Sequence, residues 1–123
     1  MPRTVRTIDQ SRVRRDFAAA VNMSATELEN WLRTVSSHAV GWKGVDGRAR
    51  ESVGHASGRQ IVRILRKTND DLTAEDYAHM RKVVGYVHRH RAQPPANIYT
   101  SRWRYSLMNW GHDPVKADGG TSE

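Results

Sequence analysis

The fold is decided by residues 77–112, YAHMRKVVGYVHRHRAQPPANIYTSRWRYSLMNWGH. These 36 residues contain no Asp or Glu, although the chain of 123 residues has 13 acidic side chains. They carry six Arg or Lys, four of the six His, all four Tyr and two of the four Trp. We expect so cationic and aromatic a segment either to bind an anionic partner or to pack its rings and leave its charges in water.

The first half of this stretch predicts an amphipathic helix over residues 74–90. Thr73 is the expected N-cap, and Asp76 stands at the third position of a capping box. Pro94 and Pro95 end the helix. Gly85 in the interior costs about 1 kcal/mol relative to Ala, so it indicates close approach by another helix or by a phosphate backbone. The buried face is predicted to hold Tyr77, Met80, Val83, Val84 and Val87, and the opposite face Lys82, Tyr86 and Arg89.

The second half predicts a short helix over residues 101–109. Thr100 or Ser101 is its expected cap, and Gly111 closes it. The apolar positions recur at i, i+4 and i+7 and are expected to face the core: Trp103, Leu107 and Trp110. Another face offers candidates for binding: Arg102, Tyr105 and Asn109.

Two further helices are predicted before residue 36. A helix over residues 11–21 follows a flexible basic arm of residues 1–8. The next helix begins after Ser24, because Glu27 three residues later completes a capping box. Its apolar side chains recur at helical spacing and predict one buried face: Leu28, Trp31, Leu32 and Val35.

Residues 36–56 hold four of the nine glycines and predict a long loop, with Trp42 and Val53 as candidate anchors to the core. A helix is expected from Ser57, with Ile61, Ile64 and Leu65 on its apolar face. No acidic residue lies three or four positions away within that helix to neutralise its cations. The cationic stripe is typical of a phosphate-binding surface or of a solvated face, and consists of Arg59, Arg63, Arg66 and Lys67.

These elements predict an all-α fold, a compact bundle of four to five helices with a long Gly-rich loop and flexible termini. The expected organisation is a basic arm over residues 1–8, a single helical domain over 9–113 and a disordered tail over 114–123. We expect one core to contain Trp31, Leu28, Ile61, Leu65, Val84, Val87 and Leu107.

The composition favours an anionic partner. The net charge is +7, and 16 of the 20 cations are Arg, whose planar fork binds phosphate bidentately. A GC-rich genome explains the same ratio through its codons. The absence of Cys excludes a disulfide framework, a thiolate metal site and a Cys nucleophile. No apolar run approaches the roughly 18 residues of a membrane span, and no secretory signal is present, so we expect a cytoplasmic protein without a membrane partner.

The sequence offers little support for a metal or catalytic site. His88 and His90 point about 200° apart on a helix and cannot share an ion. The acidic residues 70–76 stand beside a helix start, where they have a local structural role. Residues 54–59 suit either an anion at a helix start or a plain Ser-capped turn. We therefore expect no enzyme, no metal and no cofactor.

Three strings carry a resemblance to a known family: ESVGHASGRQIVRIL (51–65), DLTAEDYAHMRKVVGYVHRH (71–90) and RWRYSLMNWGHDP (102–114). In these strings the sequence resembles an uncharacterised bacterial and fungal family, a domain of unknown function, over about residues 11–116. Its members are sometimes labelled "DNA-binding protein", so the resemblance implies DNA binding as an expectation. The family has no assigned catalytic residues, and the resemblance therefore implies no residue roles.

We expect a small basic protein that binds nucleic acid, DNA more than RNA, mainly through phosphates. A helix-turn-helix over residues 58–67 and 74–90 fits poorly, because its connector of about six residues exceeds the usual three to four. The alternative is a protein-interaction module, or a homodimer, that uses the aromatic helix at residues 101–109. The predicted nucleic-acid contacts are Arg59, Arg63, Arg66, Lys67, Lys82, Arg89, Arg91, Arg102, Arg104 and Tyr105.

Overall fold

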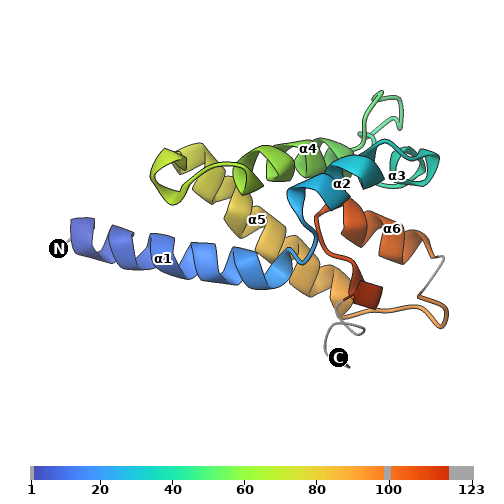
Figure 1. Cartoon of the computed structure of the whole chain (residues 1–123). Helices are drawn as coiled ribbons and strands as arrows, with labels where there is room; N and C mark the ends of the chain where they lie inside the picture. Colours follow the sequence, from blue (N-terminus) through green and yellow to red (C-terminus); the bar gives the residue numbers. More distant parts are fainter. Residues whose placement is uncertain (1, 99–100, 117–123) are drawn as a thin grey trace.

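The fold is all-α, as the sequence predicts, and the described residues contain no strand. The computed structural model describes residues 2–98 and 101–116, with side chains from residue 9 onward. Six α-helices and one 3-10 helix occur in these residues: α1 (Pro2–Ala20), α2 (Ala25–Leu32), α3 (Val35–Ala39), α4 (Val53–Leu65), η1 (Asn69–Asp71), α5 (Ala74–Arg91) and α6 (Arg102–Asn109). The two long helices, α1 and α5, pack along each other, and α4 lies over α2 with α6 beneath (Figure 1).

The predicted caps are present and explain where several helices start. Ser24 and Glu27 form a capping box at α2, and Thr73 and Asp76 form one at α5. Ser101 caps α6 by accepting a hydrogen bond from the Arg104 N–H. Gly111, at φ +83°, follows α6 in the left-handed region that favours glycine. Local hydrogen bonding thus sets these helix ends, which is why sequence spacing predicted them.

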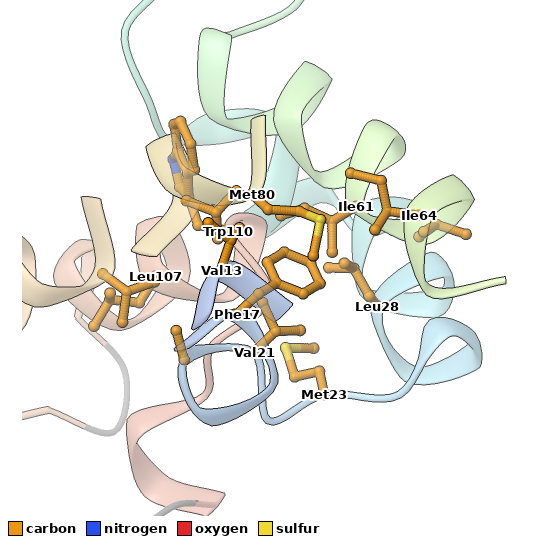
Figure 2. Packing of buried hydrophobic residues seen from close by; sticks show 14 of the residues in the cluster. Val13, Phe17, Val21, Met23, Leu28, Ile61, Ile64, Met80, Leu107 and Trp110 are labelled. Atoms are coloured by element: carbon orange, nitrogen blue, oxygen red, sulfur yellow. The ribbon is translucent and has the colours of Figure 1, made fainter. Parts of the chain in front are cut away.

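The predicted core is confirmed and extended. Leu28, Ile61, Val87 and Leu107 are buried, while Trp31, Leu65 and Val84 are partly buried against the same cluster. Helix α1, which packs along α5, adds Val13 and Phe17, and further members come from α4 and α5. Figure 2 shows the Phe17 ring among Met80, Ile61 and Leu28, so that α1, α2, α4 and α5 share one apolar centre.

The N-terminal third differs from the prediction in two places. Residues 2–8, expected to form a flexible arm, are the first turns of α1. The predicted helix from Ser24 to Val35 is broken at Thr34, whose hydroxyl accepts a hydrogen bond from the Ser37 N–H and starts α3. Val35 therefore does not continue the buried face of α2, and its side chain is 84% exposed.

The region predicted as a long loop is partly helical. Helix α3 occupies its first residues, and α4 begins at Val53, where Ser52 is the N-cap. Residues 54–59 are consequently inside α4, so neither of the two alternatives considered for them, an anion-binding turn or a Ser-capped turn, is present. The lack of side chains at Gly54 and Gly58 serves packing instead, because a Cβ there would meet Trp110 at 2.9 Å and the Asn109 carbonyl oxygen at 2.6 Å.

The C-terminal residues differ from the expected tail where they are described. Residues 114–116 form a short helical turn, and the Lys116 ammonium lies 2.5 Å from a Glu27 carboxylate oxygen. Residues 117–123 of the expected tail lie outside the described residues, as does Thr100, the alternative cap of α6.

Candidate functional site

The cationic stripe on α4 is largely neutralised by carboxylates from other elements. Three of its four predicted members are ion-paired: Arg59 with Glu51 at 2.6 Å, Arg66 with Glu29 at 3.2 Å and Lys67 with Asp76 at 2.6 Å. Spacing within the helix does not reveal these partners, because they lie 8 to 37 positions away in the chain. The stripe is therefore a weaker attractor of phosphate than its sequence suggests.

The firmest of these pairs is the one between Arg59 and Glu51. Two guanidinium nitrogens of Arg59 donate to the Glu51 carboxylate, at 2.8 and 2.6 Å. This bidentate contact, aided by a hydrogen bond from His55, lowers the pKa of Glu51 to about 2 against the opposing effect of burial. Glu51 thus stays negatively charged at neutral pH and occupies Arg59.

Arg63 differs from the rest of the stripe because it makes no ion pair within the described part of the chain. It lies near His79 of α5. Burial lowers the pKa of His79, and the charges of Lys82 and Arg63 lower it further. The Ser57 hydroxyl lies 2.8 Å from the His79 ring and links α4 to α5 at this point. Arg63 of α4 and Lys82 of α5 are thus both near enough to His79 to act on its charge.

A groove runs along α5 from His79 toward the C-terminal end of the helix. It consists of three adjoining cavities of about 260, 260 and 300 Å³. The first and second share Lys82 and Trp110, and the second and third share Tyr86 and Arg89. None of the described residues that line it is Asp or Glu. We call it the α5 groove.

Five parallel rings form one wall and floor of the α5 groove. Their order is His79, Trp110, Tyr86, His90 and Trp103, with successive centroids 6.2, 4.2, 5.2 and 5.9 Å apart and interplanar angles of 12–15°. The Trp103 indole N–H also donates to the His90 carbonyl oxygen at 2.7 Å, which ties α6 to the end of α5. Burial lowers the pKa of His90 and raises that of Tyr86, so the stack holds no charge of its own near neutral pH.

The two cations of the α5 groove are Lys82 and Arg89. They stand seven residues apart on α5, which is about 10 Å along the helix axis. Neither makes an ion pair with any carboxylate that the structure describes. Gly85 lies between them, and a Cβ there would meet the Arg89 guanidinium at 3.0 Å. The predicted close approach at Gly85 is therefore made by this side chain and not by a neighbouring helix.

The remaining predicted contacts do not line the α5 groove, and three of them have structural partners. Arg102 donates to the Ala39 carbonyl oxygen at 3.1 Å. Arg104 is ion-paired with Asp113 at 3.1 Å. Tyr105 packs on Trp31, with ring centroids 5.3 Å apart. Arg91 is exposed near the C-terminal end of α5.

For two residues near the α5 groove, Trp42 and Asn109, the sequence predicted the wrong environment. Trp42, predicted to anchor the loop, is 62% exposed at the lip of the α5 groove. Asn109, predicted as a binding candidate, is 1% exposed and forms hydrogen bonds with Trp31 and Ser37. The only sequence signal at Trp42 was a single Trp in a Gly-rich segment, and this signal does not indicate whether the ring is buried or exposed.

Neither a metal cluster nor a membrane-spanning helix occurs among the described residues. His88 is exposed, His90 faces the Trp103 carbonyl oxygen at 3.2 Å, and nowhere in residues 2–98 and 101–116 do three potential ligands gather. The helices of the described chain are each too short or too polar to cross a membrane.

The fold and the α5 groove define a small all-α protein with a basic, aromatic groove on its surface. A family model described as "Protein of unknown function (DUF3140)" matches residues 16–108, and the chain belongs to this family. The match covers α2 to α5 completely and most of α6. The chain matches no curated protein and no solved structure.

Proposed function

We propose that this protein binds nucleic acid, DNA in preference to RNA, through the α5 groove. The observation that carries the proposal is the charge distribution at the groove: among the described residues, no carboxylate pairs with Lys82 or Arg89, and no acidic side chain lines the groove. A net charge of +7 adds long-range attraction for a polyanion. We place the main interface at the α5 groove and not at the α4 stripe, because three of the four cations of the stripe are ion-paired with carboxylates of the protein itself.

The proposed contacts divide between phosphates and bases. Lys82 and Arg89 provide phosphate contacts, and Arg63 extends the positive surface from α4 toward His79. Trp42 offers an exposed ring face on which an unstacked base can pack. The ring stack beneath is tied by hydrogen bonds to α4 and α6, so it forms a rigid floor that loses little entropy on binding.

The alternative, an interaction surface on α6, has less support. Trp110 is only 4% exposed, and Trp103 is half-buried against His90. The large apolar side chains that are most exposed among the described residues belong to α3, to the loop after it and to the start of α4. A homodimer through α6 would therefore have few apolar side chains to bury.

A salt-dependent DNA titration tests the proposal. Fluorescence anisotropy of a labelled duplex compares the wild type with Lys82→Gln/Arg89→Gln over low to moderate salt. The matched control is Arg66→Gln/Arg81→Gln, which removes the same charge from two exposed, ion-paired positions. We expect the groove variant to bind more weakly and its log–log salt slope to be shallower by about 1.8, or 0.9 for each lost phosphate contact.

The control variant should keep a nearly wild-type slope, because its arginines are already paired. Melting curves of both variants should match the wild type within about 0.5 kcal/mol of stability, since exposed charges contribute little to folding. A flat salt response of the wild type would contradict nucleic-acid binding. Equal losses in the two variants would show that net charge, and not the α5 groove, attracts the DNA.

A further inference from the structure

A second cavity, separate from the α5 groove, lies between α2, α3 and α4. Its volume is about 420 Å³, which falls within the range of about 300–1,000 Å³ of small-molecule sites. Leu32 and Val62 supply its apolar lining, and Arg33, Arg63 and Arg66 stand among the charged residues around it. It shares no lining residue with the α5 groove. We call it the arginine cavity.

One wall of the arginine cavity is held by a chain of hydrogen bonds. The His55 ring is buried between the Glu51 carboxylate and the Leu32 carbonyl oxygen, the latter at 2.8 Å. Glu51 in turn holds Arg59 through two bonds. The His38 ring packs against the His55 ring at a tilt of 31°, with ring centroids 4.2 Å apart. The wall therefore keeps its shape without a ligand, which lowers the entropy lost on binding.

The rim of the arginine cavity is cationic in excess. Four arginines line the cavity, against one lining carboxylate, Glu29, and Glu51 behind the wall, which leaves 4 − 2 = +2 without counting His. Arg33 and Arg63 make no ion pair with any carboxylate that the structure describes. Their guanidinium groups are the available donors, and such groups grip phosphate or carboxylate through two parallel hydrogen bonds.

We infer that the arginine cavity binds a small organic anion, with its phosphate or carboxylate group on Arg33 and Arg63 and its apolar body against Leu32 and Val62. The charge excess selects the anionic group, and the apolar lining favours a ligand with a hydrocarbon or ring body over a bare ion. The volume suits one small molecule and excludes a nucleic-acid duplex. The inference does not require DNA binding at the α5 groove, although Arg63 belongs to both proposed surfaces.

Calorimetric titration with three probes tests this inference. 1-Naphthyl phosphate carries both the ring and the anion, 1-naphthol carries only the ring, and inorganic phosphate carries only the anion. We expect naphthyl phosphate to bind at least about tenfold tighter than either of the others, which corresponds to about 1.4 kcal/mol. Equal binding of naphthol would overturn the anionic part of the inference, and equal binding of inorganic phosphate would overturn the apolar part.

Two variants locate the site. Arg33→Gln/Arg63→Gln should weaken naphthyl phosphate about tenfold or more, as expected for the loss of charge-assisted bonds. Lys82→Gln/Arg89→Gln removes the same charge from the α5 groove and should leave this affinity unchanged. Amide spectra of the wild type should shift at α2 and α4 on titration. The inference would be overturned if the wild type did not bind naphthyl phosphate, or if both variants lost affinity equally. Amide shifts confined to α5 and α6 would also overturn it. Each of these results is independent of the DNA titration.

Discussion

Replacing Asn109 by Ala should destabilise the fold strongly, although Asn109 stands on a short surface helix. The side chain is 1% exposed and makes three hydrogen bonds. Its oxygen accepts from the Trp31 indole at 2.7 Å and from the Ser37 hydroxyl at 2.5 Å, and its amide donates to the Ser37 carbonyl oxygen at 3.1 Å. One amide thus joins α2, α3 and α6 beside the floor of the α5 groove.

The expected loss follows from these bonds. Each contributes about 1 kcal/mol net, so their removal costs about 3 kcal/mol. Ser37 is 0% exposed, and its two groups cannot turn to water, which places the true cost at or above that sum. Ala favours a helix more than Asn does, so local propensity acts in the opposite direction and cannot mimic the effect. The melting temperature should fall by about 12 °C, at about 4 °C per kcal/mol for a domain of this size.

Urea unfolding followed by Trp fluorescence measures this loss. Asn30→Ala on α2 is the matched control, since Asn30 is exposed on a helix of equal length and should change stability by less than about 0.5 kcal/mol. Ser37→Ala combined with Asn109→Ala should cost less than the sum of the two, because both remove the bond between the Ser37 hydroxyl and the Asn109 oxygen. A loss below about 1 kcal/mol for Asn109→Ala, or one equal to the control, would refute the role assigned to this amide.

Three further substitutions test the packing and the charges. Gly58→Ala should cost about 1–3 kcal/mol in urea unfolding, because its Cβ would lie 2.6 Å from the Asn109 carbonyl oxygen; a gain, as helix propensity alone predicts, would contradict this close contact. Met80→Ala should cost about 2–5 kcal/mol by the same measurement, since Met80 is 2% exposed at the centre of the core. For Glu51→Gln, stability is compared across acid pH. The pKa of Glu51 is lowered to about 2 in the fold, so the wild type has this stabilisation above pH 4.5 and loses it as pH falls toward 2. The Gln variant should show a flatter profile in that window, and identical profiles would exclude the Arg59 contact as the cause.

The sequence determined the features that depend on neighbours along the chain. Capping boxes at Ser24 and Thr73 were recognisable because a cap and its partner are three residues apart. The buried faces of α4 and α5 followed from helical periodicity, and Ile61, Met80 and Val83 are all buried as expected. These signals are local, so they predicted an all-α fold and most of its core.

Only the tertiary structure decided which charges are available. Arg59, Arg66 and Lys67 looked equally unpaired along the chain, but folding brings a carboxylate from another segment to each, while Lys82 and Arg89 receive none that the structure describes. The tertiary structure also decided the burial of Trp42 and Asn109. The Trp42 ring is exposed, whereas Asn109 is buried and forms hydrogen bonds with other helices. Ion pairs and burial depend on distances between residues remote in sequence, and periodicity within one helix contains no information about them.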